Sequence, residues 1–262
     1  MTQHSDVGGA GRLNPGAGPE GRRAARRWWR TPWALAALAA VVVFNLFYAL
    51  PRYLQFNPKL SRVPLDPTFF GHGDGHFAVV VVHVIAGNLA MVTMFVQLVP
   101  WIRRNHPKIH RISGRVYMLG GVLPTAVLAL ILVPYSTAPI GNVGLVAMAV
   151  LWLSTTAMGY VRIRQHRYLE HRRWMYYSFA LALGTSWGRV LGELGQHVPA
   201  LAINDTDIFL EIAGWLGWIV NLALVQIWLE FTSKRVTEAS LAPRRRRRTS
   251  EASVTRTEKV LP

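Results

Sequence analysis

The chain has 262 residues, no cysteine and a formal net charge of +16. Without cysteine it has no disulfides, thiolate metal sites or cysteine nucleophiles. The apolar fraction, 51%, is that of an average soluble domain, but the charged residues lie in short stretches between long, nearly uncharged runs. A run of about 20 apolar residues spans the hydrocarbon core of a bilayer as a helix. The pattern predicts an all-α integral membrane protein.

The order of apolar and polar segments along the sequence predicts one domain, residues 33–231, between two disordered tails, 1–32 and 232–262. The N-terminal tail is rich in Gly, Pro, Ala and Arg and has little to bury. The first apolar run could be a signal peptide, but it is long and no small-x-small cleavage site follows it, which favours an anchor. The predicted six-helix transmembrane bundle has spans at 33–50, 76–101, 114–135, 143–161, 174–195 and 208–231.

The basic residues predict the orientation. The two tails and the segments 102–115 and 162–173 hold 25 Lys and Arg, whereas the other three loops hold 3. Because cytoplasmic loops carry the excess of Lys and Arg, both termini are expected in the cytoplasm, with the protein multi-pass in a bacterial-type plasma membrane. Basic residues that flank spans do not predict nucleic acid as a partner, and the sequence leaves protein partners open. A polybasic run predicts binding to anionic lipid headgroups at the cytoplasmic face: Arg244, Arg245, Arg246, Arg247 and Arg248.

Ionisable side chains inside spans are costly in lipid and therefore point to function. His83 and Arg189 each lie about 10 Å below the outer boundary, at 1.5 Å per residue. Polar and small residues share a helix face with each of them. Two interpretations stay open: a polar pocket between the second and fifth spans, open to the outer side, or a structural clasp in which Glu193 neutralises Arg189. The candidate cluster is His76, His83, Gln97, Arg189 and Glu193.

A second set of histidines lies at the cytoplasmic boundary. The segments RRNHPKIHRISGRVY and RIRQHRYLEHRRWMYY place His110 and His171 just before a span, at similar depth. Paired imidazoles on different helices are what a b-type haem requires, so these two residues are the candidate haem ligands. The alternative is a basic, lipid-facing loop in which both are interfacial polar residues.

Other catalytic patterns are missing from the sequence. It contains no GxSxG, phosphate loop, dinucleotide fingerprint or HExxH. The residue pattern therefore predicts no metal site and leaves open whether the protein is an enzyme.

Several short motifs recur in a known family. They are His83 with Gly87 and Gln97, His110-Arg111 with Gly114-Arg115 and Tyr117, and His171-Arg172 with Trp174-Met175 before Arg189. In these the chain resembles a bacterial family of predicted membrane proteins, domain of unknown function 2306. The resemblance implies a four-helix core with flanking helices and no established activity. The layout is also distantly similar to cytochrome b561-type bundles, although their histidine pairs within the spans are missing here.

These observations lead to three functional hypotheses. The first is a small redox or ligand-binding membrane protein, with haem-linked electron transfer as its redox form. The second is a transporter or permease that uses the outer His83–Arg189–Glu193 cluster. The third is a non-catalytic membrane scaffold.

Overall fold

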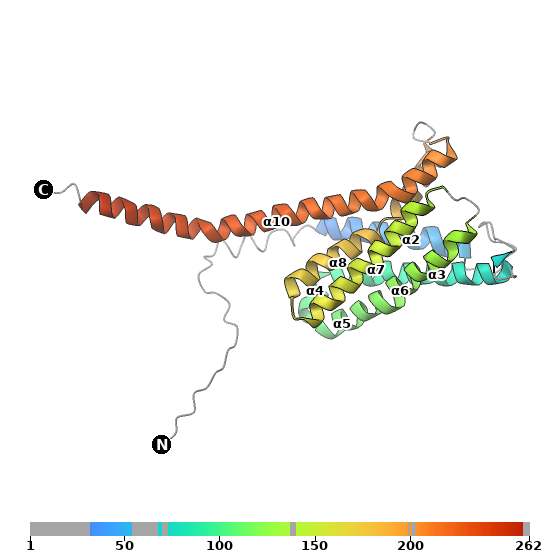
Figure 1. Ribbon diagram of the computed structural model, residues 1–262, viewed down its shortest axis with the longest axis horizontal. Helices are drawn as coiled ribbons and strands as arrows, with labels where there is room; N and C mark the ends of the chain where they lie inside the picture. Colours follow the sequence, from blue (N-terminus) through green and yellow to red (C-terminus); the bar gives the residue numbers. More distant parts are fainter. Residues whose placement is uncertain are drawn as a thin grey trace, which may run out of the picture. The chain divides into compact units, whose positions relative to one another are not determined.

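The computed structural model is helical throughout the regular structure that it describes (Figure 1). It describes residues 32–53, 68–69, 73–136, 140–198, 200 and 203–258, with side chains as far as Thr232. The expected disordered tail 1–32 lies outside these residues except for its last position. The chain divides into two units, Met1–Ala34 with Arg235–Pro262, and Leu35–Lys234. The second of these, called unit 2, holds the described side chains that matter for function.

Unit 2 is a bundle of helices. Helices α7 and α8 pack along each other, and α3 packs against η4 and α6 (Figure 1). The elements are α2 (Pro32–Tyr53), α3 (Gly73–Leu98), α4 (Pro100–Asn105), α5 (Pro107–Arg115), the π-helical η4 (Val116–Val122), α6 (Leu123–Leu132), η5 (Val133–Tyr135), α7 (Asn142–Arg164), α8 (Tyr168–Ala182), α9 (Ser186–His197) and α10 (Thr206–Glu258).

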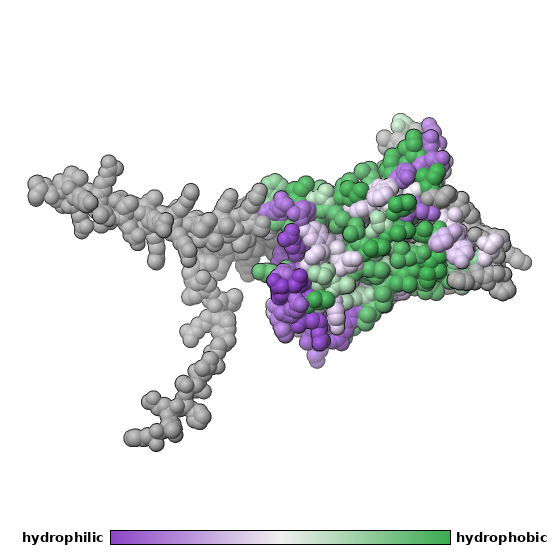
Figure 2. Space-filling view, viewed as in Figure 1, coloured by the Kyte–Doolittle hydropathy of each residue, from purple (hydrophilic) through white to green (hydrophobic). Residues whose placement is uncertain are grey.

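Four helical stretches in the described part are long and apolar enough to cross a membrane: Gly75–Leu98, Pro107–Tyr135, Asn142–Arg164 and Thr206–Thr232. They match the predicted second, third, fourth and sixth spans. Figure 2 shows a broad apolar area on the face of unit 2, with hydrophilic residues gathered toward its ends. Large apolar side chains such as Phe47, Leu119 and Val143 are 66% to 76% exposed. Such a surface is unfavourable in water and suits lipid. The all-α class is confirmed for the described residues, with four candidate spans. The six-helix count and the cytoplasmic termini stay predictions.

The predicted fifth span is not one helix. Residues 174–195 are divided between α8 and α9, with a turn at Leu183–Thr185. In the turn the Gly184 amide donates to the Leu181 carbonyl and the Ser186 amide to the Leu183 carbonyl, each three residues back. Glycine lacks a Cβ and is a poor helix former, and here Gly184 packs directly against Gly217 of α10. The prediction of a continuous fifth helix was wrong because this close contact favours the break.

The predicted loop 102–115 is also largely helical. Pro100 and Pro107 lie in the first turns of α4 and α5. In the first turn a backbone N–H has no partner within the helix, so the missing N–H of proline costs nothing there. Helix α5 then continues through η4 into α6 as a single apolar stretch. His110 and His171, expected just outside their spans, therefore lie within α5 and α8.

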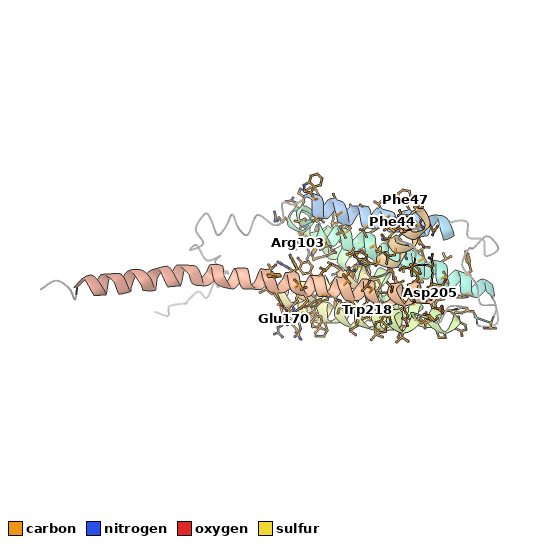
Figure 3. All side chains as sticks on the ribbon, turned by 90° about the horizontal axis from the view of Figure 1, so that it is seen from above. Phe44, Phe47, Arg103, Glu170, Asp205 and Trp218 are labelled. Atoms are coloured by element: carbon orange, nitrogen blue, oxygen red, sulfur yellow. The ribbon has the colours of Figure 1, made fainter. Side chains whose placement is uncertain are left out.

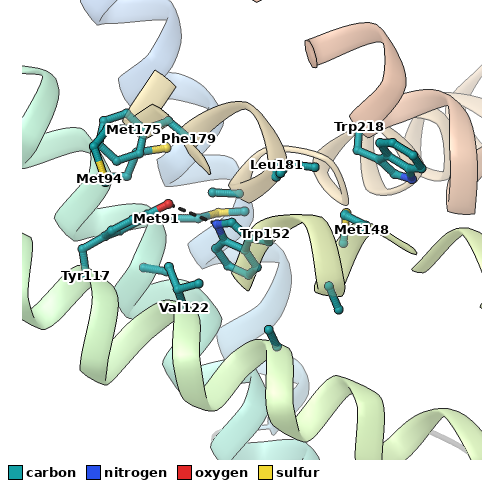
Figure 4. Packing of buried hydrophobic residues seen from close by; sticks show 14 of the residues in the cluster. Met91, Met94, Tyr117, Val122, Met148, Trp152, Met175, Phe179, Leu181 and Trp218 are labelled. Carbon is teal, nitrogen blue, oxygen red and sulfur yellow. Dashed lines mark hydrogen bonds between the residues drawn. The ribbon is translucent and has the colours of Figure 1, made fainter. Parts of the chain in front are cut away.

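The centre of unit 2 holds a buried hydrogen-bond network around Tyr117, which is completely buried in η4. Its hydroxyl lies 2.7 Å from Ser178 Oγ of α8 and accepts from Trp152 Nε1 of α7 at 3.1 Å (Figure 4). Ser178 Oγ also lies 2.7 Å from Thr156 Oγ1 of α7. Phe179 meets the Tyr117 ring edge-on, with 5.1 Å between ring centres. One hydroxyl thus joins three helices away from lipid.

Replacing Tyr117 by phenylalanine is expected to destabilise the protein by about 1–3 kcal/mol, because the Trp152 N–H and the Ser178 hydroxyl each lose a partner in a buried site. Thermal unfolding of the purified protein in detergent measures the loss. The control is Tyr160→Phe, which removes the hydroxyl of a half-exposed tyrosine on α7 and should leave the midpoint unchanged. Equal midpoints for both variants would contradict the network.

Candidate functional site

A cavity of about 270 Å³ lies among α3, α6, α7, α8 and α9 in unit 2. Its walls are mostly apolar, and polar groups enter from four of these helices and from the residues next to them. One of them, Ser136, is exposed and follows η5, so the cavity reaches the α6–α7 end of the bundle. The lining residues that carry the argument are His83, Asn88, Thr125, Met148, Thr185 and Arg189.

His83 on α3 is held in a defined orientation. Its Nδ1 lies 2.9 Å from the backbone carbonyl oxygen of Thr125 on α6. A carbonyl accepts but does not donate, so Nδ1 carries the proton in this bond. In the neutral ring Nε2 is then a hydrogen-bond acceptor for a ligand.

Arg189, in the second turn of α9, is fixed by the first helix of the bundle. Its Nη1 donates to Asn45 Oδ1 at 2.6 Å, and its guanidinium carbon lies 5.5 Å from the centre of the Tyr48 ring. Asn45 is completely buried and also donates to Ser186 Oγ at 3.0 Å. Asn45 was not among the residues predicted from the sequence, although an isolated amide in an apolar run indicates a polar partner in the bundle.

Two polar atoms of the cavity wall have no hydrogen-bond partner among the described residues: Asn88 Oδ1 and Thr125 Oγ1. Both residues are 7% exposed. Leaving a buried polar atom unpaired costs about 1–3 kcal/mol. Asn88 lies five residues beyond His83 on α3, which is about 7 Å deeper at 1.5 Å per residue. A ligand in the cavity with hydrogen-bonding groups could provide partners for Asn88 Oδ1 and Thr125 Oγ1.

The turn between α8 and α9 also contributes to the cavity wall. Thr185, the residue before α9, lines it together with Arg189. The first turn of a helix presents backbone N–H groups and the positive end of the helix dipole. A guanidinium and a helix N-terminus therefore meet at one wall, and both favour an anionic group.

The structure brings together two of the five residues in the predicted cluster, His83 and Arg189, at one cavity. His76 stacks on Phe69 with 4.8 Å between ring centres. Gln97 lies toward the other end of α3, where its Nε2 donates to the His110 carbonyl and to Ser113 Oγ, both at 2.6 Å. The Glu193 carbonyl oxygen accepts from His197 Nδ1. These three residues do not line the cavity.

The candidate haem ligands, His110 and His171, are close enough to interact electrostatically. His171 Nδ1 donates to the Gly159 carbonyl at 2.7 Å. Neither imidazole lines the cavity, and the Arg103 charge acts on His110. Haem ligation by this pair stays a prediction.

The predicted lipid-binding run, residues 244–248, falls within the bounds of α10. Its side chains lie outside those that the structure describes. Headgroup binding by this run stays a prediction.

Comparison with known proteins gives one match. The family model described as predicted membrane protein (DUF2306) covers residues 80–229, more than half of the chain. This range includes every residue that lines the cavity and leaves out α2. No curated protein and no solved structure matches the chain. The family resemblance predicted from the sequence is confirmed.

Proposed function

Since this chain belongs to the DUF2306 family of predicted membrane proteins, we propose that it is a multi-pass protein that binds a small, largely apolar anion inside the bundle. The observation that carries the proposal is the cavity between His83 and Arg189, with two unpaired buried polar atoms in its wall. Its volume, about 270 Å³, is just below the usual range of about 300–1,000 Å³ for drug-sized ligands. The ligand is therefore small.

The chemistry of the wall defines the ligand class. Arg189 and the start of α9 favour a carboxylate or another compact anion. Asn88 Oδ1 and His83 Nε2 accept hydrogen bonds, which favours a hydroxyl or amine on the ligand. Met148 and the alanines and leucines around it favour an apolar body. A small hydroxylated or aminated carboxylic acid meets all three requirements.

The membrane arrangement that we propose has six crossings and both termini in the cytoplasm. The crossings added to the four apolar stretches are α2 and the broken pair α8–α9. The asymmetry of 25 Lys and Arg against 3 supports it. In this arrangement the α6–α7 turn is on the outer side, so the cavity would take its ligand from outside.

Transport is a second candidate, favoured by the break between α8 and α9. Interrupted helices whose ends face a substrate near the middle of the bilayer are typical of secondary transporters. The turn at Leu183–Thr185 lies at such an interruption beside the cavity. Binding at the cavity is common to both candidates, and the following experiment tests it.

Cysteine labelling in this cysteine-free chain tests the cavity directly. Ala129→Cys places a thiol at the cavity wall. In right-side-out membrane vesicles, we expect the sulfonate-bearing methanethiosulfonate reagent to label it about tenfold faster than the trimethylammonium-bearing one, because the Arg189 charge attracts anions. Adding Arg189→Gln should remove this preference. Hexanoate should slow the labelling, whereas hexylammonium should not.

The matched control is Val127→Cys on the same helix, a residue that is 39% exposed and outside the cavity lining. Since it faces lipid, both reagents should label it slowly. Equal rates for the two reagents at position 129, or no protection by hexanoate in folded protein, would refute the anion-binding proposal. Labelling only from the opposite side of the membrane would refute the orientation but not the cavity.

A further inference from the structure

Cationic side chains from three helices gather at the end of unit 2 opposite the cavity mouth. Arg103 of α4 interacts electrostatically with Arg104, with His110 of α5 and with Arg172 of α8. Arg172 lies 5.6 Å from the centre of the Tyr176 ring. Figure 2 shows hydrophilic residues gathered at this end, and Figure 3 labels Arg103 and Glu170 there, with Asp205 at the other end.

The acidic group on α8 at this end is already shared by other arginines. Glu170 forms ion pairs with Arg162 at 3.1 Å and with Arg167 at 2.6 Å. Holding Arg103 and Arg172 close together has an electrostatic cost that an anion between them would reduce. Two guanidinium groups near each other favour an anionic ligand such as a phosphate group.

An unpaired atom points to the same place. His110 Nδ1 is buried and has no hydrogen-bond partner among the described residues. The backbone carbonyl of the same residue accepts from Gln97 Nε2, which ties this part of α5 to α3. The ring is thus attached to a fixed backbone, and its unpaired nitrogen marks where a ligand oxygen would bind.

We propose that Arg103, His110 and Arg172 bind the phosphate of an anionic lipid headgroup. Guanidinium groups bind phosphate oxygens through paired N–H donors, and the N–H of a neutral imidazole can add another donor. Trp101, 60% exposed beside Arg103, is typical of the membrane–water interface.

A lipid fits this end better than free phosphate does, although the phosphate chemistry is the same. Ile109 and Ile112 flank His110 on α5 and are 48% and 61% exposed. They offer apolar surface to acyl chains directly below the headgroup. This site differs from the run at 244–248 because its groups come from three packed helices.

Native mass spectrometry of the full-length protein in detergent tests the site. Dioleoyl phosphatidylglycerol and dioleoyl phosphatidylcholine are titrated in parallel. The wild type should bind the anionic lipid preferentially, and Arg103→Gln with Arg172→Gln should weaken that binding by about tenfold or more. The matched control, Arg115→Gln with Arg164→Gln, removes the same charge from two exposed positions on α5 and α7 and should leave the tight binding intact.

Several outcomes would overturn the proposal: unchanged phosphatidylglycerol binding in the folded cluster variant, an equal loss in the control, or equal binding of both lipids by the wild type. If inorganic phosphate at millimolar concentration displaces the lipid completely, the acyl chains contribute nothing, and the site is one for free phosphate. If the double variant does not fold, the single variants Arg103→Gln and Arg172→Gln are titrated, and each should lose several-fold. Full binding by both would also overturn the proposal.

Discussion

Replacing Gly217 by alanine is expected to reduce the free energy of unfolding by about 3 kcal/mol, the upper end of the usual cost of overpacking. A Cβ at this position of α10 would overlap the Gly184 carbonyl oxygen and lie 3.1 Å from Trp187 Cβ. The carbonyl belongs to the turn that divides α8 from α9, so it has little freedom to move aside. Folded yield and thermal unfolding in detergent measure the effect.

Gly192→Ala on α9 is the matched control. The added Cβ would lie 3.5 Å from Phe209 Cζ, an ordinary van der Waals distance. Alanine favours a helix by about 1 kcal/mol over glycine, so this variant should be as stable as the wild type or more stable. If Gly217→Ala also proved neutral, α10 would not pack against the turn as described.

Replacing Asn45 by leucine is expected to cost about 2–3 kcal/mol, because the amide hydrogen-bonds the charged Arg189 in a buried site. Arg189→Met alone should also be destabilising, since it leaves the amide oxygen without this donor. The double variant should cost less than the sum of the two, with a coupling energy of about 1.5–3 kcal/mol. Thermal or chemical unfolding of the wild type, the two single variants and the double variant gives this coupling energy.

A control cycle uses Phe47 in place of Asn45 as the residue on α2. Phe47 is 76% exposed on the same helix (Figure 3). Phe47→Leu and Arg189→Met should have additive effects because the Phe47 side chain is largely exposed, away from the buried Asn45. Additivity in the Asn45 cycle as well would mean that Arg189 does not depend on α2.

The helical class and four of the spans could be predicted because they depend on properties of single segments, length and hydropathy. The break at Leu183–Thr185 could not be predicted in this way. It depends on contact between Gly184 and Gly217, residues from two distant segments. The helical nature of α4 and α5 was also missed, because a basic composition resembles a loop even where Pro100 and Pro107 begin helices.

The candidate site was predictable in part for a similar reason. His83 and Arg189 were identified because ionisable residues stand out in apolar sequence, and their similar depths suggested that they meet. Asn88 and Thr125 drew no attention because an amide or hydroxyl can satisfy itself on its own helix. Only packing shows that one polar atom of each stays unpaired. The sequence suggested Glu193, four residues away, as a partner of Arg189. The structure adds Asn45 of α2, whose Oδ1 accepts from Arg189 Nη1 and which the sequence did not indicate.

The fifth crossing that we propose, divided between α8 and α9, also bears on how the protein is made. Helix α8 has 15 residues and α9 has 12, and a crossing requires about 20. Neither half can enter the bilayer as an independent segment during synthesis. Because α8 packs along α7, we expect these helices to insert together as a hairpin, with α9 completing the crossing once α10 has emerged from the ribosome. Variants that weaken the α7–α8 contact should therefore reduce the amount of protein that reaches the membrane.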